Sequence, residues 1–446
     1  MATENPRVAV TKALSDLHRH DKYSNIAWEE FLKNAGLSDS DRAFSSRLFY
    51  GVIERRLTLD FVLSSFCSTP LRKLHPLVLE TLRVALYQLL YMDKIPVSAA
   101  VNEAVSGIRR LKQGQAAGFI NAVLRNILRK KDTLFSDLPA GDKGLSIRHS
   151  CPEELIAFWR SAYGDDLAKQ LVECINEIPD SYVRVNTLKT DDTEFANLLE
   201  NLGIGYQISG DIPHCFQLKC AYLLNNLESN DKNCYYYQDK ASQIACYALQ
   251  ACPNESIADV CAAPGGKSFT TAQYMENRGT LLACDIYAAK CETMKRRAAD
   301  LGITLLNTSE RDASLPCGEE YFEKFDRVIC DVPCSGLGVI RRKPEIRYKS
   351  LAEFQDLPAL QYTILEQSSG MVKPGGVLQY STCTLNPAEN EQVTARFLKQ
   401  HPEFEPRELP LPSFFHAAGL QPSHQITLFP PIHGTDGFYI AGFRKK

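Results

Sequence analysis

The chain lacks what a membrane protein or a disulfide-bonded secreted protein needs. It has no apolar run long enough to span a bilayer, and it begins with a polar stretch, residues 1–5, instead of a signal peptide. Its 15 cysteines are an odd number and include no Cys-x-x-Cys pair, the spacing of many zinc sites. We therefore expect free thiols in a reducing cytoplasm, no membrane contact and no bound metal.

The chain also has no excess of positive charge. Lysine and arginine number 50 against 53 acidic residues, a formal net charge of −3, so any nucleic-acid surface must be local. Most basic clusters are solvated faces; here they lie at 55–56, 109–112, 125–131 and 341–343. The composition is that of an ordinary globular protein, and 446 residues predict roughly two to four domains.

Residues 1–135 show helical periodicity throughout. Apolar side chains recur at helix spacing in 8–17, 77–90 and 119–128, and glycines and prolines divide the stretch into several helices. The pattern predicts a compact all-α domain. Asn121 and Arg125 would lie one turn apart on one face of its last helix.

A connector and a small mixed segment are expected next. Residues 136–178 predict a connector containing helices, and residues 179–234 predict a strand, a helix and a second strand, a small α+β unit. Arg184 and Asn186 would share one side of the first strand. They are candidates either for RNA phosphate contact or for pairing with neighbouring residues.

Residues 235–446 alternate between strands and helices, which predicts an α/β domain with a parallel sheet covered on both faces. The last two strands are expected to form an antiparallel hairpin. The predicted strands are 256–260, 280–286, 303–307, 327–332, 376–381, 425–429 and 437–443. In such folds the ligand lies at the carboxyl ends of the strands.

Three loops at those strand ends carry the chemistry. The first is the glycine turn 259–267, where adjacent glycines allow close backbone approach and a helix start offers N–H donors, although a tight turn also uses glycine for geometry alone. The second loop, 331–338, contains Cys334, and the third, 380–384, contains Cys383. Two thiols at a ligand-binding edge are unusual, because structural cysteines are mostly buried in the core.

A thiol suits one chemistry in particular. Carbon 5 of cytosine is a poor nucleophile, so a thiolate that adds to carbon 6 must first convert the ring into an enamine that accepts a methyl group. The residues alone do not decide which thiol attacks. Cys383 and Cys334 both remain candidates at this point.

The three loops resemble the signature motifs of the S-adenosylmethionine-dependent RNA (cytosine-5) methyltransferases, the RsmB/NOP/NSUN family. The helical region, with segments 47–52, 100–105 and 118–125, resembles the NusB-type RNA-binding domain. The order of these parts is similar to that of the family's bacterial 16S ribosomal RNA branch and covers nearly the whole chain. The resemblance implies an all-α NusB-like domain (1–135), a helical connector (136–178), an RRM-like α+β segment (179–234) and a Rossmann-like class I methyltransferase domain (235–446).

The resemblance also implies roles for single residues. Cys383 would be the covalent nucleophile and Cys334 would assist breakdown of the adduct, although DNA cytosine-5 methyltransferases use the thiol of a Pro-Cys pair, which here is Cys334. Asp331 would contact the cytosine edge, and Lys267 would support the developing charge unless it is merely a solvated lysine of the first helical turn.

S-adenosylmethionine is the implied cofactor. The residues expected to bind it are Cys261, Ala262, Ala263, Pro264, Gly265, Gly266, Lys267, Asp285, Asp312 and Asp331. Asp285 would hold the ribose hydroxyls, and Asp312 would meet the adenine amino group unless it is an ordinary loop aspartate.

The implied partner is 16S ribosomal RNA, free or in an early assembly state, with one cytosine as the target and the enzyme a monomer. Arg341, Arg342 and Lys343 would contact its phosphates. The same chemistry on transfer RNA, another RNA or DNA remains an alternative. So does a non-catalytic RNA-binding adaptor, which the helical region alone would fit.

Overall fold

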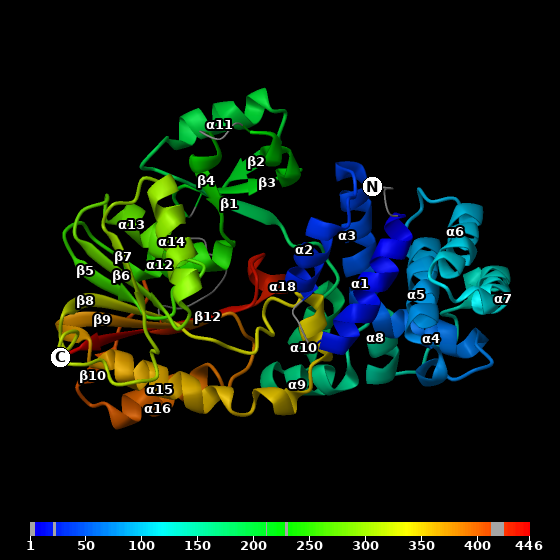
Figure 1. Cartoon of the computed structure of the whole chain (residues 1–446). Helices are drawn as coiled ribbons and strands as arrows, with labels where there is room; N and C mark the ends of the chain where they lie inside the picture. Colours follow the sequence, from blue (N-terminus) through cyan, green and yellow to red (C-terminus); the bar gives the residue numbers. More distant parts are fainter. Residues whose placement is uncertain (1–4, 21–23, 211, 228–230, 412–422) are drawn as a thin grey trace. The chain divides into compact units, whose positions relative to one another are not determined.

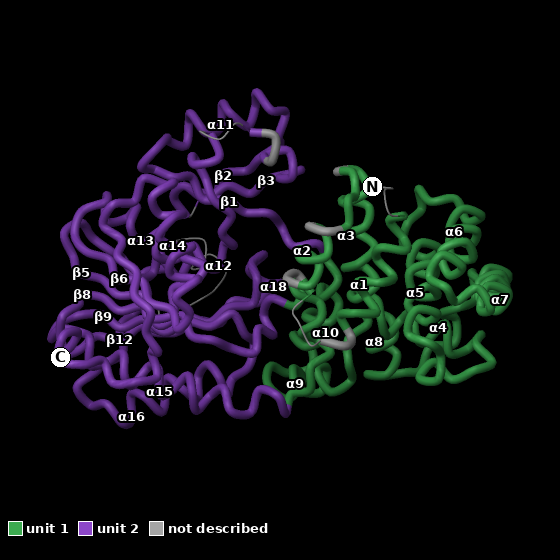
Figure 2. Tube along the Cα trace, in the orientation of Figure 1, with its two compact units in different colours: residues 1–177, 340–351 green, residues 178–339, 352–446 purple. Residues whose placement is uncertain are grey.

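The computed structural model describes residues 5–20, 24–210, 212–227, 231–411 and 423–446, so most of the polar start of the chain lies outside the described residues. The chain forms two compact units, 1–177 with 340–351 and 178–339 with 352–446, and each is described by itself (Figure 2). No helix among the described residues is long and apolar enough to cross a membrane.

The first unit is all helical (Figure 1). Its main helices are α1 (Pro6–His20), α2 (Ser24–Asn34), α3 (Asp39–Glu54), α4 (Arg56–Phe66), α5 (Pro76–Tyr91), α6 (Val97–Arg110), α7 (Ala117–Arg129), α8 (Asp142–His149), α9 (Glu153–Tyr163) and α10 (Asp165–Cys174). Fully buried leucines from α3, α4 and α5 build one core together with Ile120 and Leu124 of α7. The predicted connector differs from the structure, because α8 to α10 belong to this same unit.

The position of segment 340–351 also differs from the prediction. The sequence predicts it within the catalytic domain, 235–446, but it belongs to the helical unit, where Pro344–Tyr348 forms a short 3-10 helix. The Arg347 side chain is 1% exposed and donates hydrogen bonds to the carbonyl oxygens of Glu54 (3.0 Å) and Ile175 (3.2 Å). This buried guanidinium fixes the segment to α3 and to the end of α10.

The second unit contains two sheets. The smaller one has the order β2-β3-β1-β4, with all pairs antiparallel, and carries α11 (Asp192–Asn201). Its strands are β1 (Ser181–Val185), β2 (Tyr206–Ile208), β3 (Cys215–Leu218) and β4 (Tyr235–Tyr237).

The larger sheet has the order β10-β12-β9-β8-β5-β6-β7, and β11 pairs with β12. Strands β5 to β9 run parallel, whereas β10, β11 and β12 are antiparallel additions at one end. The strands are β5 (Ser256–Asp259), β6 (Thr280–Asp285), β7 (Leu306–Glu310), β8 (Phe325–Asp331), β9 (Val372–Thr382), β10 (Phe404–Pro406), β11 (Gln425–Leu428) and β12 (Phe438–Lys445). The predicted Rossmann-like sheet and terminal hairpin are both present.

Helices cover both faces of the larger sheet, as alternation of strands and helices requires. One face packs on α12 (Lys240–Leu249), α13 (Gly266–Tyr274) and α14 (Ala288–Asp300). The other packs on α15 (Leu357–Ser369) and α16 (Glu391–Gln400). Because β8 lies between β5 and β9, the loops that follow these three strands meet at one edge.

Candidate active site

The two cysteine loops converge at the carboxyl edge of the sheet. The sulfur atoms of Cys334 and Cys383 lie 3.3 Å apart, and both side chains are half-buried free thiols. Cys334 follows the end of β8 and Cys383 follows the end of β9, which are neighbouring parallel strands. The sequence therefore predicted the meeting of these thiols correctly.

Cys334 is held as a neutral thiol. Its hydrogen bond with Cys383, its burial and the nearby charges of Cys383 and Glu389 raise its pKa well above the usual value. A neutral S–H can donate to a neighbouring thiolate. A Cys334 thiol that keeps its proton is therefore placed to donate it to Cys383.

A buried carboxylate holds both loops in place. Glu389 is fully buried and accepts hydrogen bonds from Ser335 N (2.9 Å) and Gln361 Nε2 (2.8 Å) through Oε2, and from Ser335 Oγ (2.5 Å) and Asn386 Nδ2 (2.8 Å) through Oε1. Ser335 Oγ also lies 2.6 Å from Thr384 Oγ1, next to Cys383. The sequence analysis missed Glu389, because nothing in the spacing of 386–390 shows that its carboxylate folds back under the Cys334 loop.

Glycines bring the same loops into backbone contact. Gly338 N donates to Cys383 O at 3.1 Å, and Gly437 N donates to Gly338 O at 2.9 Å. A Cβ atom at Gly338 would lie 2.0 Å from Gly437 O, so no larger residue fits without movement. The residue that precedes strand β12 thus takes part in fixing the Cys334 loop.

Lys267 and Asp331 form an ion pair at this edge. Lys267 Nζ donates to Asp331 Oδ2 at 2.7 Å, and Ser381 Oγ donates to the other carboxylate oxygen at 2.7 Å. Burial lowers the pKa of Lys267, but the attraction of Asp331 outweighs it and the net pKa is raised, so the amine stays charged. With its side chain only 13% exposed, Lys267 is not the solvated lysine considered as its alternative.

The glycine turn leads into α13 through a residue in the left-handed backbone conformation. Gly265 has φ +106°, and a Cβ atom there would lie 2.4 Å from the ring of Phe269. The turn is fixed by Gly265 N, which donates to Ala262 O, and by Ala262 N, which donates to Cys284 O, both at 2.7 Å. The positive φ and the contact with Phe269 therefore require glycine at position 265.

Two aspartates stand at the neighbouring strand ends. Asp285, at the end of β6, accepts from Tyr287 N at 3.0 Å and lies 3.5 Å from Lys290 Nζ. Asp312 accepts from the Ser314 side chain and backbone, and these hydrogen bonds lower its pKa. Both are carboxylate acceptors, the type that a ribose diol or an adenine amino group requires, so the residues fit a nucleoside cofactor.

Two of the predicted RNA contacts are corrected. Arg184 and Asn186 are fully buried, so neither side chain can reach a phosphate. Arg184 Nε donates to Gln273 Oε1 at 2.8 Å and its guanidinium lies over Tyr274, while Asn186 Nδ2 donates to Leu301 O at 2.9 Å. They join the small sheet to α13 and α14, which is the alternative role considered for them.

Three other predicted contacts lie in the helical unit. Arg342 is exposed, and Arg341 and Lys343 are half-buried, in the segment that Arg347 anchors. Asn121 and Arg125 share an exposed face of α7 as expected, with Arg125 Nε donating to Asn121 Oδ1 at 3.0 Å. Contact of any of these with RNA stays a prediction.

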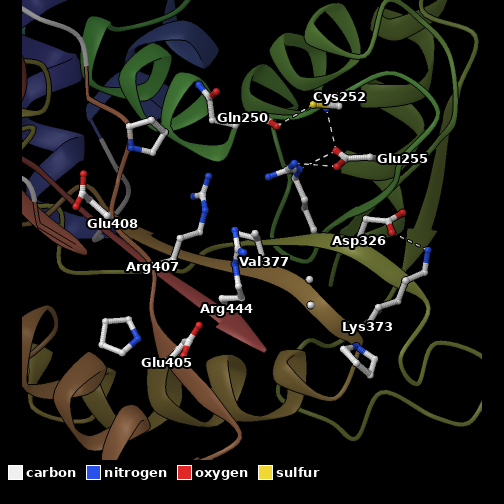
Figure 3. Close-up of a pocket in the computed structure, with 16 residues that line it drawn as sticks. Gln250, Cys252, Glu255, Asp326, Lys373, Val377, Glu405, Arg407, Glu408 and Arg444 are labelled. Atoms are coloured by element: carbon white, nitrogen blue, oxygen red, sulfur yellow. Dashed lines mark hydrogen bonds and ion pairs between the residues drawn. The ribbon is translucent and has the colours of Figure 1, made fainter. Parts of the chain in front are cut away.

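A hollow of about 860 Å³ lies at the opposite edge of the sheet and contains none of the predicted site residues (Figure 3). Two of its four cations pair with acids of the lining: Arg327 donates to Glu255 at 2.7 and 2.8 Å, and Lys373 donates to Asp326 at 2.8 Å. Within the described part of the chain, no group of three or more His, Cys, Asp or Glu side chains could hold a metal ion. The edge with the two thiols is therefore the candidate site.

The chain is similar to known families along nearly its whole length. Residues 246–444 match the model of the 16S rRNA methyltransferase RsmB/F family, residues 4–129 match the NusB family, and residues 151–224 match the ferredoxin-like domain of RsmF/B-like methyltransferases. The NusB match lies in the helical unit, and the RsmB/F match covers nearly all of the larger sheet. The ferredoxin-like match runs from α9 of the helical unit through β1, β2 and β3 of the small sheet.

Single proteins give the same result. A probable ribosomal RNA small subunit methyltransferase B of Bacillus subtilis is 34% identical, with all of both chains covered. A ribosomal RNA small subunit methyltransferase B of Klebsiella pneumoniae is 31% identical, over 92% of this chain and 91% of its own. The crystal structure of PH0851 has a TM-score of 0.82 and 25% identity and covers 99% of both chains.

Proposed function

Because the chain belongs to the 16S rRNA methyltransferase RsmB/F family, we propose that it methylates carbon 5 of one cytosine in 16S ribosomal RNA through a covalent cysteine adduct. S-adenosylmethionine is the methyl donor of this methyltransferase. The observation that carries the proposal is the 3.3 Å separation of the two thiols beside the Lys267–Asp331 pair. We propose the cytoplasm as its location, since this RNA would be its substrate.

The cofactor would lie along the glycine turn and the two aspartates. Residues 261–267 would surround its methionine end, Asp285 would accept from the ribose hydroxyls, and Asp312 would accept from the adenine amino group. Ile286, an isoleucine that is 51% exposed directly after Asp285, offers an apolar face for the base. Bound there, S-adenosylmethionine supplies an activated methyl carbon at the thiol edge.

Cys383 would act as the nucleophile. Its thiolate adds to carbon 6 of the cytosine, forming a C–S bond, and the displaced electrons make carbon 5 able to attack a methyl group. Asp331 would accept a hydrogen bond from the cytosine amino group, and the Lys267 ammonium would stabilise negative charge on the ring. Carbon 5 would take the methyl carbon as the donor's sulfonium–methyl bond breaks. A water molecule at this half-buried edge would then accept the proton of carbon 5, and the electrons of that C–H bond would expel the Cys383 thiolate and restore the aromatic ring.

Cys334 would assist the breakdown of the adduct. Its sulfur atom is within hydrogen-bond distance of the sulfur that must leave, so it can stabilise the departing thiolate by donating its proton. The target base must also leave its stack to reach this edge, which favours an accessible cytosine in a structured RNA.

Bisulfite sequencing of RNA from cells with and without the gene tests the proposal. We expect one cytosine of 16S ribosomal RNA to lose its methyl mark in the deletion strain and to regain it with the native gene. The Cys383→Ala variant should fail to restore the mark while still binding S-adenosylmethionine in calorimetry. A mark lost only from transfer RNA would reassign the substrate, and a variant with full activity would remove the proposed nucleophile.

A further inference from the structure

A hollow of about 580 Å³ lies where the small sheet meets helix α14. It is lined by Leu224, Lys232, Tyr235, Tyr236, Tyr237 and Arg297. The three tyrosines are the whole of strand β4, and β4 is an edge strand of its sheet. Among the described residues, the lining contains two cations and no carboxylate.

Tyr237 presents a rigid aromatic ring to solvent. Its side chain is 53% exposed, yet its hydroxyl donates to Ala221 O at 3.0 Å and its ring meets that of Tyr235 edge-on, with centroids 5.8 Å apart. Tyr235 is itself buried in the core of the small sheet. An exposed ring fixed at both ends loses little conformational entropy when another ring stacks on it.

The two cations keep their charge available. Arg297 Nη1 donates to Asn233 Oδ1 at 2.9 Å, and Nη2 donates to the carbonyl oxygens of Tyr235 and Lys232 at 3.4 and 3.5 Å. All of these acceptors are neutral, so they orient the guanidinium without cancelling its charge. Lys232 is exposed and has no carboxylate within ion-pair distance among the described residues.

From this arrangement we propose that the hollow binds an unpaired nucleotide of the RNA substrate. The base would stack on Tyr237, and its phosphate would lie between Lys232 and Arg297. The inference rests on the proposed function, because it takes RNA as the substrate. In place of the buried Arg184 and Asn186, it uses an exposed tyrosine of the small sheet, a lysine that precedes this strand and an arginine of α14.

The bound nucleotide would be distinct from the target cytosine. Arg297 stands nine residues after the start of α14 at Ala288, or roughly 14 Å along the helix. Helix α14 begins directly after the end of β6, near Asp285. The hollow would therefore hold a nucleotide other than the target and contribute to the choice of substrate.

Equilibrium binding of a labelled single-stranded RNA oligonucleotide to the full chain, without S-adenosylmethionine, tests the proposal. Tyr237→Ala should weaken binding by roughly tenfold, as expected for the loss of one stacked base, whereas Tyr237→Phe should retain it. Phe322→Ala is the matched control, because Phe322 is 58% exposed and lies outside the hollow. Equal affinity of the native chain and Tyr237→Ala would overturn the site.

The charge contribution is measured separately. Lys232→Gln should lower the slope of log affinity against log salt by about 0.7, while Lys295→Gln, an exposed lysine of α14 outside the lining, should leave it unchanged. Full displacement of the oligonucleotide by equimolar adenosine monophosphate would overturn the proposal in favour of a free-nucleotide site. In methylation assays Tyr237→Ala should raise KM and keep kcat. If the native chain binds the oligonucleotide but methylates no RNA, that result contradicts the proposed function and leaves this binding site standing.

Discussion

Cys334 and Cys383 are neighbours with different expected roles, and their sulfur atoms lie within hydrogen-bond distance of each other. The hydrogen bond between them, the burial of Cys334 and the charge of Glu389 all favour a protonated Cys334. A thiolate at Cys383 would then be stabilised by the proton of its neighbour. The 3.3 Å geometry therefore allows the roles that the family resemblance implies, with Cys334 donating to Cys383.

Asp259, at the end of β5, makes stability depend on pH. Burial, only partly offset by the Ser268 hydroxyl, raises its pKa to about 7. Between about pH 4 and pH 7 the unfolded chain loses this proton while the folded chain keeps it, so the free energy of unfolding falls as the pH rises. The contribution is on the order of a few kcal/mol.

We expect Asp259→Asn to remove this pH dependence. The thermal midpoint of the native chain should fall more between pH 5 and pH 8 than that of the variant, as measured by circular dichroism. The difference between the two curves isolates this carboxyl from all others. Parallel curves would show that Asp259 is ionised in the folded chain throughout this range.

Glu389 holds the loops that carry the two thiols, so replacing it should affect both stability and catalysis. Its carboxylate faces four donors, so Glu389→Gln turns one acceptor into a donor opposite Ser335 or Asn386. We expect a loss of about 1–3 kcal/mol in stability and a fall in kcat with little change in KM. Steady-state kinetics and thermal unfolding measure both.

The control for this variant is Glu408→Gln, which changes an exposed glutamate in the same unit. It should match the native chain in both measurements. If Glu389→Gln keeps the native kcat, the loop network does not position the thiols for the reaction.

The elements that the sequence revealed best are buried parallel strands. The predicted strands 256–260, 280–286 and 327–332 agree with β5, β6 and β8 to within two residues at each end, because continuous apolar runs mark strands buried on both faces. Strand β7 begins three residues later than predicted, since its residues Leu306–Glu310 are mostly polar. The three-residue edge strand β10 contains a proline and was missed.

The candidate site was predictable only in part. Loops that follow neighbouring parallel strands must meet, so Cys334, Cys383, Asp331 and Lys267 could be brought together from topology. Glu389 could not, because its role depends on how a loop folds back. The predicted RNA contact of Arg184 was wrong. Alternation along a strand shows which residues share a face of the sheet, but not whether that face is exposed to solvent or packs on helices.

At the scale of the whole molecule, the chain leaves the second unit after Val339 and returns at Ala352. The segment between them is held in the helical unit by Arg347, which also donates to Asn176 Oδ1 at 2.8 Å. A charged residue is rarely buried as completely as Arg347. Nothing in the sequence indicates that Arg347 is buried and that the basic residues 341–343 are not.

We expect Arg347→Met to destabilise the helical unit by several kcal/mol, roughly 1–3 for each buried carbonyl left without a donor. The exposed Arg342→Gln, in the same segment, should change stability by less than about 0.5 kcal/mol. Thermal unfolding of both full-length variants measures this. Equal midpoints would show that the segment is not anchored through Arg347.

Covalent trapping is the most direct test of the two-thiol mechanism. The Cys334→Ala variant, incubated with 16S ribosomal RNA and S-adenosylmethionine, should accumulate a protein–RNA complex that survives denaturing electrophoresis, with the RNA attached to Cys383 in peptide mapping. Cys334→Ala combined with Cys383→Ala should form none. An adduct on Cys334 in the Cys383→Ala variant, or no adduct in any variant, would contradict the mechanism.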